Sequence, residues 1–234
     1  MKKIHVNFLE PPQEQLDILL KYYQAGRYVE VEKLSLSITQ EFPKHQFAWK
    51  VLAVVLKQNG RINESLIVSQ KSVQLDPQDA EAHNNLGVLL QEQGRLNEAE
   101  KSHRKAIDLK PDYAEAHNNL GNMLKELERL DEAETCYKKV ITLKPDYAKA
   151  HNNLGVLLKE QGRIKEAEAS YAQAIVLEPD YVQAHYNLGV LLQELERLDE
   201  AEASYNHAIA LKPDFIDALK NRWMILFDQK RYEA

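Results

Sequence analysis

Apolar and polar positions recur along this chain with a period of 34 residues. The stretch AEAHNNLG at 80–87 returns at 114–121, as AKAHNNLG at 148–155 and as VQAHYNLG at 182–189. On an α-helix, which turns by about 100° per residue, the alanine, histidine, leucine and glycine of this stretch fall on one side. The two asparagines fall on the other side. Internal repeats of this kind typically indicate a solenoid, so we interpret the chain as an array of similar repeats.

Prolines set the boundaries of these repeats. Six of them lie 34 residues apart, at Pro43, Pro77, Pro111, Pro145, Pro179 and Pro213. If this proline is numbered as position 32, the 234-residue chain contains six complete repeats: 12–45, 46–79, 80–113, 114–147, 148–181 and 182–215. A lead-in of residues 1–11 precedes them, and a partial seventh repeat covers 216–234.

Each repeat is expected to form two helices. In the repeat 80–113, positions 2–14 predict a first helix over 81–93, and positions 18–31 predict a second over 97–110. Gly94 permits the turn between them, and a capping box of Asn97 with Glu100 is expected to open the second helix. Pro111 ends that helix, because the residue before a proline avoids the α region. Asp112 is then expected to cap the first helix of the next repeat, as the aspartate after the proline would in the later repeats.

Small residues indicate where the helices cross. Four consecutive repeats have glycine at position 8 and alanine at position 20: Gly87, Gly121, Gly155 and Gly189, with Ala99, Ala133, Ala167 and Ala201. A glycine inside a helix costs about 1 kcal/mol relative to alanine, so its recurrence predicts a close approach of the two helices. One helix pair cannot bury both of its apolar faces, whereas stacked pairs bury them against their neighbours.

Small residues at positions 8 and 20, an aromatic residue at 24, alanine at 27 and proline at 32 resemble the tetratricopeptide repeat. The resemblance covers nearly the whole chain, and the array is similar to the repeat arms of protein O-GlcNAc transferases and of bacterial transferases that carry such repeats. It implies an all-α fold, a right-handed superhelical solenoid of antiparallel helix pairs whose first helices line a concave groove. The flanking repeats depart from the pattern, with Leu19 and Trp223 at position 8, as is expected of repeats that cap an array.

The first helix of each repeat leaves a polar stripe at positions 2, 5, 6, 9, 12 and 13, which would face the groove. Its asparagines resemble the asparagine ladder of the O-GlcNAc transferase repeats. A carboxamide both donates and accepts hydrogen bonds, so it can pair with a peptide main chain of any sequence. The candidate peptide-binding residues are Asn84, Asn85, Asn118, Asn119, Asn122, Lys125, Asn152, Asn153, Lys159, Tyr186, Asn187 and Asn221. The alternative is that asparagine is a tolerated helix-surface residue that recurred with the duplicated repeat.

These features favour a protein–protein interaction scaffold that binds an extended peptide or a helix in the groove. A carboxylate clamp for peptide C-termini, a pocket of some tetratricopeptide proteins, is incomplete here, because Lys50 at position 5 is followed by Val54 at position 9. Two alternatives remain open. Because the chain stops at position 19 of its seventh repeat, it would be an arm that presents substrates within a larger bacterial transferase. Alternatively, the unfinished repeat would expose apolar surface that drives self-association with another copy.

Composition and charge narrow the classes of partner. The net charge is −6, and the stripe of the four central repeats carries three lysines against six glutamates, which disfavours the phosphate contacts that nucleic acid requires. No apolar run approaches the ~18 residues of a membrane span, and the N-terminus has no apolar signal core. Cys136 is the only cysteine, which excludes an internal disulfide and fits a reducing, cytoplasmic compartment.

No sequence motif indicates catalysis, a metal or a cofactor. The chain has no glycine-rich phosphate loop, nucleophile elbow or HExxH pattern. The histidines at position 4 occur once per repeat, on the packed side: His83, His117, His151 and His185. Helices about 8–10 Å apart do not bring single histidines to the ~2 Å of zinc coordination. We therefore expect packing histidines, no metal site, no cofactor and no enzyme activity within this chain.

Overall fold

The computed structural model describes residues 10–229, and within this range the chain forms thirteen α-helices and no strand. The helices are α1 (Gln13–Gln24), α2 (Tyr28–Glu41), α3 (Gln46–Gln58), α4 (Ile62–Leu75), α5 (Ala80–Glu92), α6 (Leu96–Leu109), α7 (Ala114–Glu126), α8 (Leu130–Leu143), α9 (Ala148–Glu160), α10 (Ile164–Leu177), α11 (Val182–Glu194), α12 (Leu198–Leu211) and α13 (Ile216–Asp228). Most of the expected lead-in, and the start of a second helix in the seventh repeat, lie outside the described residues.

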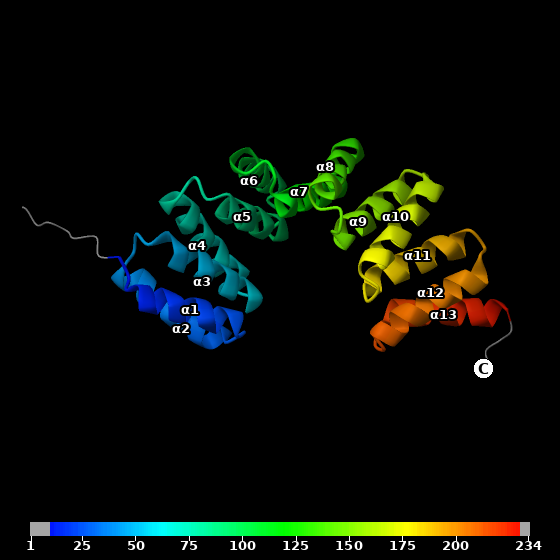
Figure 1. The fold of residues 1–234 in the computed structure, drawn as a ribbon, viewed down its shortest axis with the longest axis horizontal. Helices are drawn as coiled ribbons and strands as arrows, with labels where there is room; N and C mark the ends of the chain where they lie inside the picture. The colour runs from blue at the N-terminus through cyan, green and yellow to red at the C-terminus, as the bar shows by residue number, and fades with distance from the viewer. Residues whose placement is uncertain (1–9, 230–234) are drawn as a thin grey trace, which may run out of the picture. The chain divides into compact units, whose positions relative to one another are not determined.

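The described chain divides into two compact halves, one up to Ala116 and one from His117, and the division falls within α7. In the N-terminal half, α3 pairs with α4 and α5 pairs with α6, while α2 and α4 also pack against the first helix of the following repeat (Figure 1). The C-terminal half repeats this arrangement with the pairs α9–α10 and α11–α12 and with α13 on α12. Each half is therefore an all-α stack of helix hairpins.

A three-residue turn joins the two helices of a repeat, as the sequence predicts. Gly94 has a φ of +70° in the turn between α5 and α6, a conformation that glycine adopts without strain. Its N–H donates to the carbonyl of Gln91 at 2.9 Å, which satisfies one of the free carbonyls at the end of α5. Two repeats lack this glycine, and there Glu128 and Glu196 adopt φ values of 57° and 59°. The turn geometry is thus common to all repeats, even where the residue type opposes it.

The helices begin one residue earlier than predicted, and the caps predicted for α6, α9, α11 and α13 are wrong. Helix α6 begins directly after Arg95, which makes no side-chain capping bond, so Asn97 already lies inside the helix. The first helices of three later repeats begin after aromatic residues that also provide no side-chain cap: Tyr147, Tyr181 and Phe215. The aspartates expected to cap them precede these aromatic residues. Asp79 does cap α5, accepting a hydrogen bond from the Ala82 N–H at 3.0 Å.

Instead of the predicted capping box, an arginine at position 16 directly precedes the second helix of each complete repeat. Its guanidinium pairs with the glutamate three residues later in each of the six complete repeats: Arg27–Glu30, Arg61–Glu64, Arg95–Glu98, Arg129–Glu132, Arg163–Glu166 and Arg197–Glu200. Arg163 and Arg197 also reach the second helix of the preceding repeat, at 2.8 Å from Glu134 and 2.7 Å from Glu168. Exposed ion pairs stabilise little individually, but these link the turn of one repeat to its neighbour.

The close helix crossing predicted from position 8 is confirmed. A Cβ atom added at Gly155 would lie 2.7 Å from the ring of Tyr171, which is buried. The same contact recurs between Gly189 and Tyr205, so these glycines let an aromatic ring from the second helix lie directly on the first helix. In α13 the corresponding residue is the exposed Trp223. That helix therefore lacks the small residue on which the crossing in the four central repeats depends.

Candidate functional site

In the C-terminal half, one side of α9 and α11 is open to solvent. It carries positions 2, 6, 9, 12 and 13 of two consecutive repeats, all exposed or half-buried: Lys149, Asn153, Val156, Lys159 and Glu160 on α9, with Gln183, Asn187, Val190, Gln193 and Glu194 on α11. We call these ten residues the asparagine face. Equivalent half-buried asparagines stand at Asn85 on α5 and Asn119 on α7.

Position 5 does not belong to this exposed stripe, contrary to the sequence prediction. Its three asparagines, Asn84, Asn118 and Asn152, are all buried. The reason is that position 5 points toward a neighbouring helix: Asn152 accepts a hydrogen bond from Asn187 of the next repeat at 2.9 Å. In the N-terminal half, Asn84 instead lies 3.1 Å from the imidazole of His103. These buried carboxamides hold helices together, and we no longer include them among the residues that face a ligand.

The exposed asparagines are bonded to the repeat before them. The side-chain amide of Asn153 donates to the oxygens of Asn118 at 3.1 Å and Asn122 at 2.9 Å. The amide of Asn187 likewise donates to Asn152. Both N–H groups of Asn153 are used within the protein, while its oxygen accepts only a long contact of 3.5 Å from Asn152. Asn153 and Asn187 at position 6 are therefore each linked to the preceding repeat, and the oxygen of Asn153 retains acceptor capacity.

Tyrosine hydroxyls bond to side-chain amides at both ends of this stretch of repeats. The hydroxyl of Tyr137 donates to Asn122 at 2.9 Å, and burial raises the pKa of this tyrosine well above its usual range. At the other end, Asn221 on α13 lies 3.3 Å from the hydroxyl of Tyr205 and 3.5 Å from that of Tyr186. Burial also raises the pKa of Tyr205 to about 12. The hydroxyl of Tyr205 in turn donates to Gln193 at 2.7 Å, so both tyrosines act as hydrogen-bond donors.

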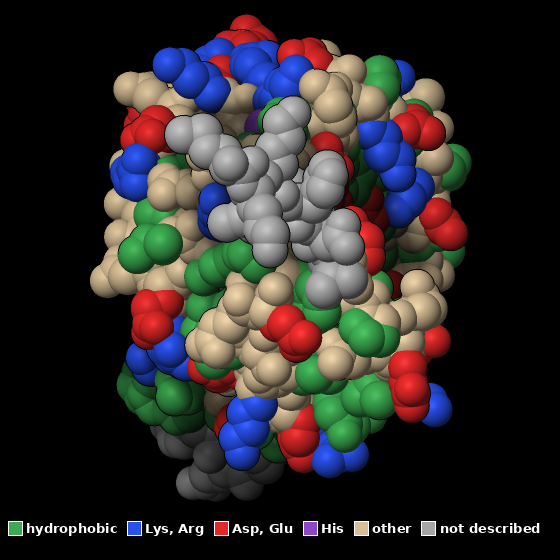
Figure 2. All heavy atoms as spheres, turned by 90° about the vertical axis from the view of Figure 1, so that its left-hand side faces the viewer, with side chains coloured by type: hydrophobic (Ala, Val, Ile, Leu, Met, Phe, Trp, Pro, Cys, Tyr) green, Lys and Arg blue, Asp and Glu red, His purple; other side chains and the backbone are tan. Residues whose placement is uncertain are grey.

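The lysines of the stripe form ion pairs with the next repeat. Lys125 lies 3.1 Å from Glu160, and Lys159 lies 2.6 Å from Glu194. The sequence predicts these lysines as ligand contacts on a stripe whose net charge is negative. The structure shows that these two lysines are engaged by glutamates of the following repeat, while the stripe of the four central repeats keeps its excess of glutamates. Basic and acidic side chains are likewise interspersed, with hydrophobic ones between them, on the face shown in Figure 2.

The same stripe has a different character in the N-terminal half, where apolar side chains line part of it. Positions 2, 6, 9 and 12 of the first two repeats line a pocket of about 180 Å³ between α1 and α3: Leu20, Tyr23, Phe47, Val51 and Val54. Lys50 on α3 and Glu81 on α5 also line it. A partial sequence signal was present, because position 6 is Val51 in the second repeat and asparagine in the later ones, and position 12 is Tyr23 in the first repeat and polar in the other complete repeats.

The histidines at position 4 fasten the loop before their own helix. The Nε2 atoms of His83, His151 and His185 lie 3.1, 3.1 and 2.8 Å from the carbonyl oxygens of Pro77, Pro145 and Pro179. Because a carbonyl can only accept, each Nε2 must carry the proton. Trp49 makes the equivalent bond to Pro43 at 3.0 Å. Within residues 10–229 no group of three histidine, cysteine or carboxylate side chains could hold a metal ion.

Two further findings concern the single cysteine and the hydropathy of the helices. Cys136 is buried in α8, where its thiol is not presented to solvent. Of the helices within the described range, none combines the length and the apolar character that crossing a bilayer requires.

Stacked helix hairpins, glycine–aromatic crossings and a 34-residue period define an all-α repeat protein. Family models described as TPR repeat match residues 90–127 and 121–162, and models described as tetratricopeptide repeat match 69–101 and 152–214. Together these matches extend from 69 to 214. The chain belongs to the tetratricopeptide-repeat family. A comparison with curated proteins finds no match.

Solved structures of tetratricopeptide-repeat proteins share the fold. A chain of the APC/C hetero-tetramer Cut9–Hcn1 superposes with a TM-score of 0.81 at 16% identity over 91% of this chain, which spans only 42% of that longer chain. YrrB, described as having an unusual peptide-binding site, gives 0.59 at 22% identity over 80% of this chain and 96% of its own. The Thermus thermophilus protein TTC0263 gives 0.67 at 26% identity over 78% of this chain and 99% of its own.

Proposed function

We propose that this chain is a non-catalytic protein-interaction scaffold and that the asparagine face binds an extended peptide. The observation that carries the proposal is the fixed orientation of Asn153. Both of its amide hydrogens are committed to the preceding repeat, so its carbonyl oxygen is positioned to accept an N–H from a peptide main chain. A preorganised acceptor loses little entropy on binding, which favours recognition of a flexible ligand.

The spacing of the ladder supports an extended ligand. Packed helices lie about 8–10 Å apart, and an extended peptide advances about 3.3 Å per residue. Successive rungs at Asn153 and Asn187 would thus meet every third residue of the peptide. Val156 and Val190 flank the rungs and offer small apolar contacts between them. The balanced lysine–glutamate pairs leave the face without strong selection for peptide charge.

The comparisons are compatible with this proposal. YrrB, which shares the fold, is described as a tetratricopeptide-repeat protein with a peptide-binding site. Cut9, in the other structure, forms a hetero-tetramer with Hcn1. Neither similarity identifies the ligand of this chain, so the peptide must be found by selection.

A displayed library of random 12-residue peptides, selected on the immobilised full chain, provides the test. We expect Asn153→Ala and Asn187→Ala each to weaken the selected peptides by about two- to tenfold, the value of one hydrogen bond. Asn206→Ala is the matched control, because Asn206 is exposed on α12 outside the face. N-methylation of single peptide bonds should cause the same loss at every third residue. Selected peptides that tolerate both substitutions and all N-methylations would contradict the proposal.

A second candidate, self-association, has support from α13. This helix exposes large apolar side chains: Ile216, Trp223, Met224 and Phe227. Trp223 and Phe227 stack with ring centroids 5.1 Å apart, which presents one flat aromatic surface. Sedimentation velocity over a hundredfold concentration range tests this candidate. A Trp223→Ser variant should shift the distribution toward the monomer, whereas identical distributions for both proteins would exclude the role of α13.

A further inference from the structure

The pocket between α1 and α3 in the N-terminal half indicates a second recognition element. We propose that it binds one large apolar side chain of a partner peptide, next to a lysine or arginine that pairs with Glu81. The inference rests on the proposed function, since it assigns ligand chemistry to the same stripe of helix positions. The pocket would bind a side chain of the peptide, whereas the asparagine ladder would bind the peptide main chain.

The size and lining of the pocket fit a single anchor side chain. Its volume of about 180 Å³ is below the range of about 300–1,000 Å³ typical of small-molecule sites. An apolar cavity of about 150 Å³ accommodates a benzene ring, so a leucine or phenylalanine side chain would fill this one. Leu20, Val51 and Val54 supply aliphatic contacts, and Tyr23 and Phe47 supply aromatic ones. Leu20 is 44% exposed, which leaves apolar surface for such a ligand to cover.

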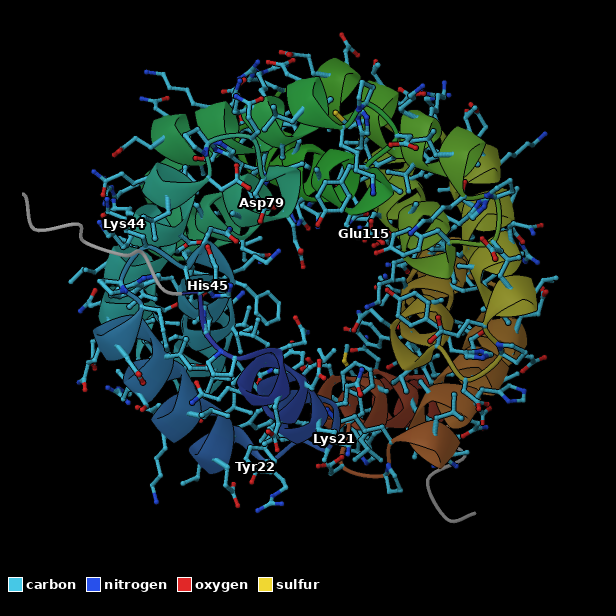
Figure 3. The ribbon with its side chains drawn as sticks, turned by 60° about the vertical axis from the view of Figure 1, so that its left-hand side comes forward. Lys21, Tyr22, Lys44, His45, Asp79 and Glu115 are labelled. Carbon is cyan, nitrogen blue, oxygen red and sulfur yellow. The ribbon has the colours of Figure 1, made fainter. Side chains whose placement is uncertain are left out.

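A charged cluster beside the pocket determines which peptide residue is favoured next to the anchor side chain. The ammonium group of Lys50 is held 3.0 Å from Asp79 and 2.7 Å from Glu81. Asp79, labelled in Figure 3, also accepts hydrogen bonds from the side chain of Gln46 at 2.8 Å and from the Ala82 N–H. Asp79 is thus fully engaged within the protein, whereas the side chain of Glu81 is 58% exposed.

The charge balance of this cluster favours a basic neighbour. Burial opposes the charge on Lys50, but hydrogen bonds to Glu81 and Asp79 outweigh it and raise the pKa of the ammonium group. Burial likewise opposes the charge on Asp79, and the Ala82 N–H and Lys50 outweigh it and lower the pKa of that carboxyl. One cation therefore stands beside two anions, and the excess negative charge lies on Glu81 at the solvent edge. An incoming carboxylate would meet a lysine that is already paired twice and an unfavourable net charge.

The experiment uses the peptides selected from the random library on the full chain, measured by fluorescence polarisation. Leu20→Asp places a charge in the pocket wall and should weaken binding by about tenfold or more. It removes apolar contact with the anchor, and the bound peptide would have to cover the aspartate carboxylate, which costs desolvation free energy. Ile67→Asp is the matched control, since Ile67 is 67% exposed on α4 away from the pocket and the chemical change is the same. Both variants alter exposed residues, and circular dichroism melting verifies that the fold is retained.

A second variant tests the charge. Glu81→Gln should lower the affinity for a peptide with lysine beside the anchor and leave the affinity for its glutamine-substituted version unchanged within twofold. Replacing the peptide's anchor by alanine should abolish the difference between the wild type and Leu20→Asp.

The outcomes separate the two proposals. Peptides that lose affinity with Asn153→Ala but bind Leu20→Asp as tightly as the wild type would support the proposed ladder and contradict the proposed pocket. Peptides that respond to Leu20→Asp alone would support the pocket and overturn the ladder. A selection that yields no peptide dependent on either residue would overturn both.

Discussion

His103 is predicted to make the N-terminal half sensitive to mild acid. It occupies position 24 of α6, where the later repeats have tyrosine, and it is buried against Gly87. Its Nδ1 lies 3.1 Å from Asn84, but its Nε2 is buried without a hydrogen-bond partner. Protonation would therefore place a charge and an unpaired donor inside the helix crossing. Burial lowers the pKa of this imidazole from 6.5 to about 4.

The magnitude follows from proton linkage. The unfolded chain binds a proton at His103 with a pKa near 6.5, whereas the folded chain resists protonation down to about 4. Stability is thus fully present above the unfolded pKa and is lost as the pH falls through this window. The difference amounts to about 3 kcal/mol in total, and about 2 kcal/mol of it is lost by pH 5. Since repeat arrays do not always unfold in one step, the effect should appear locally in α5 and α6.

Hydrogen exchange followed by mass spectrometry measures that local stability. After correction for the intrinsic exchange rate, protection in α5 and α6 should fall by about 30-fold between pH 7.5 and pH 5. His103→Tyr is the control, because tyrosine already occupies the same position opposite glycine in three later repeats. The variant retains the carboxylates that titrate in this range and lacks only the imidazole. If wild type and variant lose equal protection in these helices, the reasoning about His103 is wrong.

Three further predictions concern stability. Gly155→Ala should destabilise the chain by about 1–3 kcal/mol in urea unfolding, although alanine is the better helix former, because its Cβ would lie 2.7 Å from the ring of Tyr171; equal stability would contradict the crossing argument. Arg163→Ala should lower the melting temperature more than Arg95→Ala, since Arg163 pairs with Glu134 of the preceding repeat as well as with Glu166, whereas Arg95 pairs with Glu98 of its own repeat, and 1 M salt should reduce the difference. Asn153→Ala should cost about 1–2 kcal/mol, because it removes two hydrogen bonds and takes a donor from the buried oxygen of Asn118, while the Asn122 oxygen keeps its bond from Tyr137; an unchanged urea midpoint would show that the linked rungs do not stabilise the array.

The sequence predicted the helices well because the evidence for them is local and repeated. Gly94 marks a turn through its own backbone, and Gly155 marks a crossing because a side chain there would collide with Tyr171. The caps were predicted less well, since a one-residue shift moves Asn97 from the helix boundary into the first turn. That shift depends on the geometry of the preceding turn, which the residue pattern alone does not determine.

The candidate site was only partly predictable for a related reason. A helical wheel places positions 5 and 6 on the same side, yet Asn152 is buried and Asn153 is half-buried. The difference arises from where the next repeat's helix lies, which is a tertiary contact. Similarly, the pairing of Lys159 with Glu194 joins residues in different repeats, and composition counts each charge as if it were independent. The pocket at Leu20 was not predicted from the sequence, because it is formed jointly by residues of α1, α3 and α5, which only tertiary packing brings together.

The bonds between repeats have a consequence for how such a chain can change in length. Asn187 finds its acceptor Asn152 thirty-five residues earlier, and Lys125 finds Glu160 thirty-five residues later. Excision of residues 148–181 would bring Asn187 to the place of Asn153 and Glu194 to the place of Glu160, so every partner would be replaced by its equivalent. Unequal recombination between copies could therefore shorten or lengthen the protein by whole modules while each junction stays chemically complete.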